Sequence, residues 1–417
     1  MKNIIKHTKS LSPLSLRVID ADITLDGNSV YMVKKDENGL EYKSLVEKDQ
    51  YLYSLLTNKD DDYSANVHSF HTYVSSKCNL NCDYCYERYG TEKEAGLEEI
   101  NALLEHHKNC SIVMMGKEPT CRDDLADLIT RAGKRTCLVT NGIKLGDIAY
   151  LKKLKDAGLK TVLFSFNGLK DAIYRKMNGV DLVDAKLKAL KNLEREQINT
   201  ILSVSLERGV NEDQILPLVK FCFERRSFIF ELRIRTMTSF VRDLGAEQIY
   251  MSELINMFAD ALRIHKTDIV REFCFMQEFI KNFKWLLPKA FKDKYRSKLC
   301  SFTFHIKQNN GDTYASPGSG INLDRIKGSM LKHPYLLYYL VKAYGLSLLM
   351  ETAFNVLKLP RFIIRKKMLN ITLKCWPNLY NVDLKEMDKC TSVYYKNGKM
   401  EKFCLANIKN AAQEERK

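Results

Sequence analysis

The sequence lacks the long apolar runs that membrane-spanning and secreted proteins carry. No segment of the 417 residues reaches the roughly 18 uninterrupted apolar residues of a membrane span. Residues 1–10 include three lysines and a histidine, which interrupt the apolar core that a signal peptide needs. We therefore expect a cytoplasmic protein. In a reducing compartment its twelve cysteines favour metal binding or catalysis over disulfide bonds.

The charge balance is basic. The chain has 66 lysines and arginines against 51 aspartates and glutamates, which gives a formal net charge of +15. Such an excess suits an anionic partner such as a phospholipid headgroup, nucleic acid or a phosphorylated substrate. The lysine-rich surface of an ordinary cytosolic protein explains it equally well. We favour that interpretation and expect no nucleic-acid partner. The 45% of apolar residues is ample for the cores of two or three domains.

Three cysteines, Cys78, Cys82 and Cys85, lie within eight residues. The asparagines and aspartate between them keep this stretch out of regular structure. Iron–sulfur clusters are held by thiolates, normally four for each 4Fe–4S cluster, so three thiols would leave one iron open for another ligand. The alternatives are free thiols or a zinc site. A zinc site needs a second pair of ligands, and none follows nearby. We therefore expect a 4Fe–4S cluster on these three cysteines.

Strands and helices alternate from about residue 68. The expected strands are 71–74, 111–115, 136–139, 161–166, 200–206 and 228–234. The expected helices between them are 97–107, 123–132, 147–157, 182–196 and 212–224. Such repeated units imply parallel strands with right-handed crossovers. Six units are too few for a closed eight-stranded barrel. We therefore predict an α/β fold, a partial (β/α)6 TIM-type barrel with its functional loops at the carboxyl ends of the strands.

Two further regions flank the predicted barrel. The N-terminal region predicts a small β-rich module, with strands at 18–23 and 29–33 and a third at 41–45. After about residue 242 the alternating pattern stops, and an α+β extension begins with a helix at 253–264. The expected domains are therefore 1–67, 68–242 and 243–417.

The C-terminal extension contains four cysteines near the ends of two expected hairpins. One hairpin joins 300–306 to 313–315, and the other joins 390–395 to 400–404. Four such thiols could hold an auxiliary 4Fe–4S cluster. The alternative is that they are ordinary buried thiols, as we expect for Cys110, Cys137 and Cys222. We favour the auxiliary cluster, whose ligands would be Cys300, Cys375, Cys390 and Cys404.

An apolar stretch at 335–357 precedes a basic one at 361–367. One interpretation is an amphipathic helix that lies on a membrane, which would make the protein peripheral to that membrane. A helix buried against its own domain is the commoner explanation, and we favour it.

Polar motifs follow three of the predicted strands. Residues 116–119, Gly-Lys-Glu-Pro, follow the second strand, Asn141 lies just after the third, and Ser165 and Asn167 follow the fourth. Backbone carbonyls and Glu118 can accept hydrogen bonds from an ammonium group, and close approach of a ligand to backbone favours glycine. Each motif alone is most often a simple turn. Their order after successive strands indicates a binding site.

The Cys-x3-Cys-x2-Cys spacing, with an aromatic residue before the last cysteine, resembles the signature of the radical SAM superfamily. The three strand-end motifs resemble its Gly-Gly-Glu-Pro loop, Thr-Asn-Gly turn and Ser-x-Asp-Gly motif, although Lys117 replaces the usual second glycine. The resemblance implies that the open iron binds S-adenosylmethionine (SAM) and that a flavodoxin- or ferredoxin-type donor supplies an electron. The SAM contacts it implies are Tyr84, Gly116, Lys117, Glu118, Pro119, Asn141, Ser165 and Asn167.

Three arginines, Arg208, Arg233 and Arg235, lie at the ends of the fifth and sixth predicted strands. Arginines at the barrel mouth could hold the SAM carboxylate or an anionic substrate, and surface placement is the alternative. Among them we assign Arg208 to the cofactor site.

A closer resemblance spans nearly the whole chain. Motifs at 20–23, at Asp312 with Pro317, and at 383–407 are similar to the branch that contains the tetraether (macrocyclic archaeol) lipid synthases and dihydropterin methyltransferase-like proteins. This branch carries a rubredoxin-like iron in its N-terminal module. Ser12 and Ser15 stand where its first cysteine pair would be, so we expect no iron there.

The resemblance implies hydrogen abstraction from an unactivated carbon and carbon–carbon bond formation on a lipid chain. Modification of a ribosomal peptide or a small metabolite is the alternative. A peptide substrate is less favoured because we find no module for binding a leader peptide. A non-catalytic iron–sulfur redox protein is the third interpretation, and the substitution at Lys117 and the missing N-terminal ligands support it.

Overall fold

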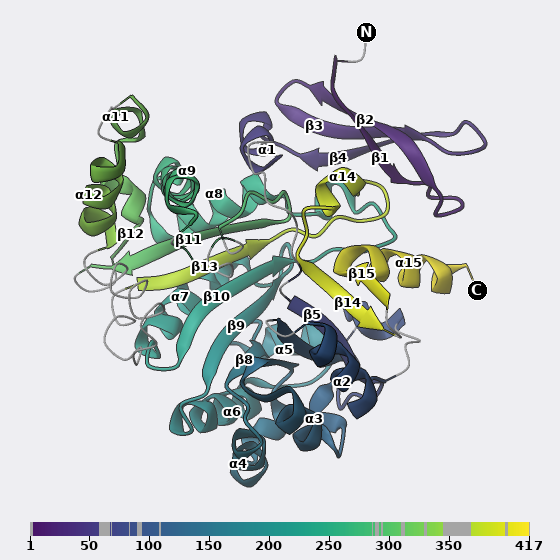
Figure 1. Ribbon diagram of the computed structural model, residues 1–417, viewed down its shortest axis with the longest axis vertical. Helices are drawn as coiled ribbons and strands as arrows, with labels where there is room; N and C mark the ends of the chain where they lie inside the picture. The colour runs from purple at the N-terminus through teal and green to yellow at the C-terminus, as the bar shows by residue number, and fades with distance from the viewer. Residues whose placement is uncertain are drawn as a thin grey trace.

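The computed structural model describes residues 3–57, 67, 69–82, 84–89, 94–107, 110–285, 287, 292, 295–309, 313–328, 332–344, 368–396 and 399–416. Within these ranges an eleven-stranded sheet forms the centre of the molecule, and a four-stranded sheet lies beside it (Figure 1). Three parts of the sequence discussed above lie outside the described residues. They are Asp312, the end of the apolar stretch and the basic stretch that follows it, the last two within 345–367.

Six parallel strands form the middle of the large sheet, and they pair in the order of the chain. Each of these strands contributes apolar side chains to the main buried core. The predicted partial barrel is therefore confirmed. Its strands are β5 (Ser69–Ser75), β6 (Ser111–Gly116), β7 (Thr136–Thr140), β8 (Thr161–Ser165), β9 (Asn199–Leu206) and β10 (Ile229–Thr236).

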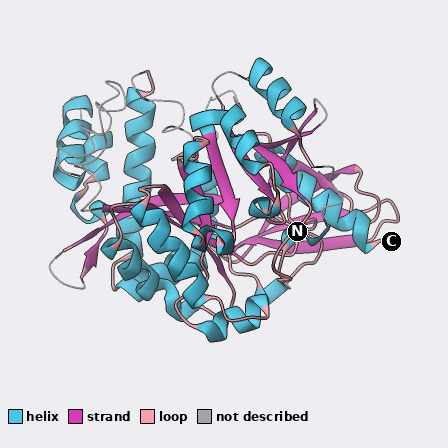
Figure 2. Ribbon diagram, turned by 90° about the horizontal axis from the view of Figure 1, so that it is seen from below, coloured by secondary structure: helices cyan, strands magenta, loops and turns pink. Residues whose placement is uncertain are grey.

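Helices follow the barrel strands and cover the sheet (Figure 2). Their apolar residues recur at helical spacing, as in the buried set Ala189, Leu190 and Leu193 of one helix. The sequence analysis did not identify one of them, α5, as a separate helix; it ends at Asn178, where Gly179 adopts a φ of 79° as its C-cap. The helices are α2 (Leu97–His106), α3 (Leu125–Ala132), α4 (Ile148–Asp156), α5 (Asp171–Asn178), α6 (Val183–Arg195) and α7 (Ile215–Glu224).

The C-terminal extension adds strands to both edges of this sheet. On one side β13 (Met368–Lys374) pairs in parallel with β10, and β11 (Ser301–Gln308) and β12 (Tyr314–Ala315) continue outward. On the other side β14 (Ser392–Lys396) pairs in parallel with β5, and β15 (Lys399–Lys402) follows. Both predicted hairpins are therefore present.

Two details of the extension differ from the sequence-based expectation. Strand β13 was not predicted, although it separates β11 from the barrel. Cys404 does not belong to the second hairpin but to helix α15 (Phe403–Glu415), because the chain turns into a helix directly after β15.

The N-terminal module is an antiparallel sheet followed by α1 (Gln50–Thr57). Its four strands are β1 (Asn3–Leu11), β2 (Val18–Asp26), β3 (Ser29–Lys35) and β4 (Glu41–Glu47), of which β1 was not predicted. The sheet lies near the short helix α14 (Leu384–Met387), as Figure 1 shows. Lys6 Nζ lies 2.9 Å from a carboxylate oxygen of Asp383, and Thr8 Oγ1 donates to the other oxygen at 2.6 Å. The module is thus attached to the C-terminal part of the chain.

Ser12 and Ser15 occupy the loop after β1. Both hydroxyls donate hydrogen bonds to the carboxylate of Glu37, with 2.7 Å from Ser12 Oγ to its acceptor oxygen. These bonds lower the pKa of Glu37. The two serines and Glu37 therefore form a hydrogen-bonded loop contact.

A second apolar cluster lies beside β11. It is built by α9 (Lys266–Phe283), α11 (Leu323–Lys327) and α12 (Lys332–Tyr344), whereas α8 (Met251–Leu262) buries its apolar side chains in the main core. In α12, Leu336 and Leu340 are buried in this cluster, whereas Leu337, Tyr338 and Val341 are exposed. The described part of the apolar stretch is therefore a helix with one buried side. No helix among the described residues is long and apolar enough to cross a membrane.

Candidate functional site

One large cavity, of about 950 Å³, runs along the inner face of the barrel strands. Side chains from all six strands line it, because alternate residues of a strand point to the same face. The cysteine loop after β5 closes one side, and Trp376 and Phe403 of the C-terminal extension also contribute. The cavity is the place where the predicted site residues meet.

The thiols of Cys78, Cys82 and Cys85 all line this cavity. Cys78 is exposed and the other two are partly buried. Burial raises the pKa of Cys78 and Cys85. A nearby cation is therefore needed to favour the thiolate over the protonated thiol. No group of three His, Cys, Asp or Glu side chains in the described ranges is arranged to hold a single metal ion. A cluster with one iron per thiolate does not need that convergence, and three thiols around one cavity fit a 4Fe–4S cluster with an open iron.

Asn178, at the end of α5, is a site residue that the sequence analysis missed. Its Nδ2 lies 3.0 Å from Cys82 Sγ and 3.4 Å from Tyr84 Oη. Its Oδ1 is buried and has no hydrogen-bond partner among the described residues. A hydrogen bond to a cluster thiolate stabilises the added negative charge of the reduced cluster. Only its place before the C-cap glycine marks Asn178 in the sequence, which says nothing of this contact.

The Gly116–Glu118 loop packs tightly against the strand that leads into the cysteine loop. Gly116 has a φ of 154°, and a Cβ there would lie 2.4 Å from the carbonyl oxygen of Ser75. This close approach explains why glycine occupies the position. The Lys117 amide donates to the same Ser75 oxygen at 2.9 Å. The side chain of Lys117 lines the cavity in place of the usual second glycine.

Glu118 joins two of the predicted motifs. Its carboxylate is 1% exposed and accepts hydrogen bonds from the amide and hydroxyl of Thr120, from Thr140 Oγ1 at 2.7 Å and from the Asn141 amide at 2.7 Å. Glu118 therefore fixes the loop after β6 to the turn after β7. Asn141 in turn donates from Nδ2 to Asn79 Oδ1 at 2.7 Å, which links this turn to the cysteine loop.

Lys186 is a second residue that the sequence analysis missed. It lies on the buried side of α6, and its Nζ donates to the carbonyl oxygens of Asn141 at 2.9 Å and Ser165 at 2.7 Å. Burial lowers its pKa to about 8. Lys186 thus ties together the turns after β7 and β8. Its spacing from the buried apolar residues of α6 is the signal that could have identified it.

Tyr84 lines the cavity, and Asn167 lies behind it. Asn167 is 1% exposed, and its Nδ2 donates to Tyr84 Oη at 2.9 Å while its Oδ1 accepts from the Ser205 amide at 3.0 Å. The structure therefore gives Asn167 a contact with Tyr84, not a place in the cavity lining. Pro119 is likewise buried outside that lining.

The three strand-end arginines lie in different places. Arg208 is not part of the lining, and its guanidinium lies 3.1 Å from Glu253 Oε1 on α8. Arg233 and Arg235 both line the cavity. Arg233 forms an ion pair with Glu231 at 2.8 Å. Arg235 donates to Ser205 Oγ at 2.7 Å, and its guanidinium lies 4.6 Å from the ring centre of Trp376.

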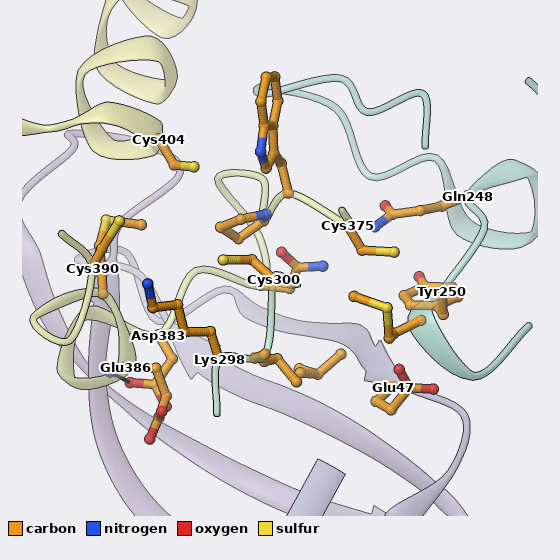
Figure 3. A pocket seen from close by; sticks show the side chains of 17 residues that line it. Glu47, Gln248, Tyr250, Lys298, Cys300, Cys375, Asp383, Glu386, Cys390 and Cys404 are labelled. Carbon is orange, nitrogen blue, oxygen red and sulfur yellow. Dashed lines mark hydrogen bonds between the residues drawn. The ribbon is translucent and has the colours of Figure 1, made fainter. Parts of the chain in front are cut away.

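A second, small pocket of about 80 Å³ lies among the four C-terminal cysteines (Figure 3). Cys300, Cys390 and Cys404 line both this pocket and the large cavity, whereas Cys375 lines only the pocket. Burial raises the pKa of Cys300, Cys375 and Cys404. The structure thus brings together the four residues that we named as auxiliary-cluster ligands. Whether they bind iron stays a prediction.

Residues 72–222 match the family described as the Radical SAM superfamily. Over these residues the chain is therefore similar to this superfamily. Members of this superfamily use a 4Fe–4S cluster and SAM, and the three loop thiols are the predicted donor set in this chain.

Among characterised proteins, the chain is similar to a 7,8-dihydro-6-hydroxymethylpterin dimethyltransferase from Methanocaldococcus jannaschii, with 29% identity over 260 residues, 52% of this chain and 50% of the relative. It is 30% identical over 181 residues to a GTP 3′,8-cyclase from Clostridium perfringens, which covers 39% of this chain and 54% of the relative. The chain thus spans about half the length of the curated relatives it matches. A solved structure of Streptococcus suis SuiB bound to S-adenosylmethionine gives a TM-score of 0.39 at 17% identity, over 53% of this chain and 46% of that chain.

Proposed function

We propose that this protein is a radical SAM enzyme that abstracts a hydrogen atom from an unactivated carbon. The observation that supports this most directly is that the thiols of Cys78, Cys82 and Cys85 face the same cavity as the strand-end loops. A catalytic radical needs an enclosed site in which it meets only its substrate. The large cavity, which has an apolar wall, would hold the radical next to its substrate.

A cluster held by Cys78, Cys82 and Cys85 would supply the one-electron reduction of SAM, with the electron coming from a low-potential donor of the flavodoxin or ferredoxin type. Hydrogen abstraction from the substrate would then give methionine, 5′-deoxyadenosine and a substrate radical. Joining two saturated carbons removes one hydrogen atom from each, so each new bond would use two electrons and two SAM molecules.

The protein's own part is to position SAM and the target carbon. Gly116, Lys117 and Asn141 would contact SAM, together with Ser165 and Tyr84, because these residues line the cavity next to the cysteine loop. Glu118 and Lys186 hold three of these segments in fixed relation. Preorganisation of this kind orients the reacting atoms before the reaction starts.

We further propose an auxiliary 4Fe–4S cluster on Cys300, Cys375, Cys390 and Cys404. These four thiols are the donor set of a fully protein-ligated cluster. Three of them also face the large cavity, so the cluster would border the space proposed for the substrate. It would therefore be placed to accept or supply an electron when the substrate radical is converted to product.

The substrate that we favour is a lipid chain, on which the enzyme would form a carbon–carbon bond. Apolar side chains from β6, β7, β8 and β9 line the cavity: Val113, Met115, Val139, Leu163 and Ile201. They would pack against hydrocarbon and shield the radical from water. The exposed apolar side chains of α12 offer a peripheral contact with a membrane from which a cytoplasmic enzyme could take such a substrate. A peptide or small metabolite is the alternative.

The decisive experiment is to reconstitute the protein without oxygen, add dithionite and SAM, and measure 5′-deoxyadenosine. We expect 5′-deoxyadenosine from the wild type and none from a variant in which the three loop cysteines are alanine. A fully loaded cluster that yields no 5′-deoxyadenosine would instead support the non-catalytic redox protein. Adding lipid or peptide substrates then separates the substrate classes, since only a true substrate should take up deuterium or release it to 5′-deoxyadenosine.

A further inference from the structure

Two cations lie side by side on the inner wall of the large cavity. Arg235 on β10 and Lys374 on β13 are partners in the register of these parallel strands. Register partners on neighbouring strands project to the same face of a sheet. Both side chains line the cavity, as this register requires. The pair was not evident from the sequence, because β13 is separated from β10 by more than 130 residues.

The two cations have no carboxylate partner among the described residues. Arg235 donates to a serine hydroxyl and lies over the rings of Trp376 and Tyr86, and Lys374 forms no ion pair with a carboxylate of the described part of the chain. The neighbouring Arg233 differs, because Glu231 neutralises it at 2.8 Å. Removing two cations from bulk water without a counterion costs free energy, which a bound anion would offset.

The acidic residues of the cavity do not neutralise these two cations. Only Glu87 and Glu118 contribute carboxylates to its described lining. Glu118 is used by the amides and hydroxyls of its own loops, and Glu87 accepts a hydrogen bond from Tyr394 Oη at 2.8 Å. The β10–β13 wall of the cavity therefore carries an excess of positive charge. It differs in this from the part of the cavity that is lined by apolar residues of β6, β7 and β8.

The cation pair also lies between the two groups of thiols. Arg235 is near enough to Cys85 and Tyr86 to influence both electrostatically. Lys374 directly precedes Cys375 and is near Cys300 and Cys390. A molecule bound to the pair would therefore lie within the space that the loop thiols and the C-terminal thiols share.

We propose that Arg235 and Lys374 form a subsite that binds an anionic group of the substrate, a carboxylate or a phosphate. This inference rests on the proposed function, because the bound molecule is taken to be the substrate of the radical chemistry. The guanidinium fork suits two oxygens of either group, and the lysine adds a point charge. The substrate would then be amphipathic, with its anionic group on β10 and β13 and its apolar part toward β6, β7 and β8.

The subsite can be tested by isothermal titration calorimetry on the anaerobically reconstituted full chain, saturated with SAM. The probes are inorganic pyrophosphate for phosphate groups and glutarate for carboxylates. We expect the wild type to bind at least one of them, and Arg235→Gln and Lys374→Met each to weaken that binding at least about tenfold. Lys374→Arg keeps the charge and should retain binding within about threefold.

Matched controls remove cations that do not line the cavity. Arg225→Gln and Lys170→Met, whose side chains pair with Glu224 and Asp213 on the surface, should leave binding unchanged. Three results would overturn the subsite. They are equal losses of anion affinity in these controls, anion binding that survives in both Arg235→Gln and Lys374→Met, and no binding of either anion to the wild type. Pyrophosphate selectivity would assign a phosphate, and glutarate selectivity a carboxylate.

The SAM carboxylate is a competing occupant, and a second measurement addresses it. If Arg235 and Lys374 serve the substrate, both variants should bind SAM with wild-type affinity within about threefold. A large loss of SAM affinity would overturn the proposal. The proposed function fails separately: wild-type protein that makes no 5′-deoxyadenosine but binds anions through this pair would leave the subsite standing.

Discussion

The two groups of thiols are built in opposite ways. Cys78, Cys82 and Cys85 lie in one loop, whereas the four C-terminal cysteines come from separate segments between residues 300 and 404. Cys300 and Cys375 meet because β11 and β13 are antiparallel neighbours, with 3.2 Å from the Cys375 amide to the Cys300 carbonyl oxygen. The first group is defined by local sequence, and the second exists only after the whole chain has folded.

The surroundings of the two groups differ as well. The loop thiols face a cavity of about 950 Å³, which leaves room for SAM and a substrate. The C-terminal thiols line a pocket of about 80 Å³, which is too small for SAM and a substrate, and three of them also border the large cavity. A site that keeps a position open suits chemistry, and a closed site suits structure or electron transfer. The following predictions test this contrast.

Cys82→Ala should have the largest effect. Loss of one of three loop ligands removes the cluster, so 5′-deoxyadenosine production should fall about a thousandfold or more. The measurement is anaerobic SAM cleavage with dithionite. Cys110→Ala removes a buried thiol outside both groups and should stay near wild type. Retention of SAM cleavage by the Cys82 variant would show that the loop thiols do not hold the catalytic cluster.

Cys390→Ala and Cys404→Ala should separate the two groups. We expect about eight irons per wild-type chain and about four in each variant, assuming two 4Fe–4S clusters. SAM cleavage in the absence of substrate should remain within about tenfold of wild type, since the loop thiols are unchanged. Iron analysis and absorbance spectra measure this. Four irons in both the wild type and the variants would remove the auxiliary cluster.

Asn178→Ala should have an intermediate effect. Losing the hydrogen bond to Cys82 Sγ makes the reduced cluster less stable, so its midpoint potential should become more negative and SAM cleavage should slow by roughly 10–100-fold. Electron paramagnetic resonance during a redox titration measures the potential. Asn282→Ala, in an α9 residue that contacts Glu278, is the matched control. An unchanged potential with normal iron content would contradict the role of Asn178.

Lys34→Met should have the smallest effect, and it asks whether the C-terminal group depends on the N-terminal sheet. Lys34 Nζ donates to the carbonyl oxygen of Leu379, in the segment between Cys375 and Cys390, at 2.7 Å. Burial lowers its pKa to about 7 from 10.5. Between pH 7 and 10.5 Lys34 is protonated in the unfolded chain but not in the folded one. The free energy of unfolding therefore rises with pH in this range, by at most about 1.4 kcal/mol per pH unit for this lysine.

Below pH 7 the contribution of Lys34 is constant, because the lysine is protonated in both states. Lys34→Met should therefore flatten the rise between about pH 7 and 10.5. Urea denaturation at several pH values measures it, with Lys170→Met as the exposed control. An identical pH slope in wild type and Lys34→Met would show that this lysine is not held at a depressed pKa. Iron content of the same variant tests the link to the C-terminal thiols.

The same contrast separates what could be predicted from the sequence from what could not. The apolar runs identified all six barrel strands, and the spacing of Cys78, Cys82 and Cys85 indicated the cluster loop. Both are local patterns. The pairing of β13 with β10 and of β14 with β5 depends on partners far away in the chain, which periodicity does not reveal.

Individual side chains show the same limit. Arg208 follows β9 as expected, but Glu253 on a later helix holds it away from the cavity. Asn178 ends a helix that was not predicted separately, and its contact with Cys82 joins residues 96 positions apart. Lys374 carries its charge into the cavity because β13 takes the place next to β10. Each of these placements was set by tertiary structure.

The edge strands have a consequence for how the protein is made. Strands β5 and β10 have one free edge each until residues 368–396 are available to pair with them. During synthesis the barrel sheet would therefore wait, with two open edges, for most of the chain to leave the ribosome. Unpaired edges of this kind favour aggregation. We expect the nascent chain to depend on chaperones, and cluster insertion to follow release from the ribosome.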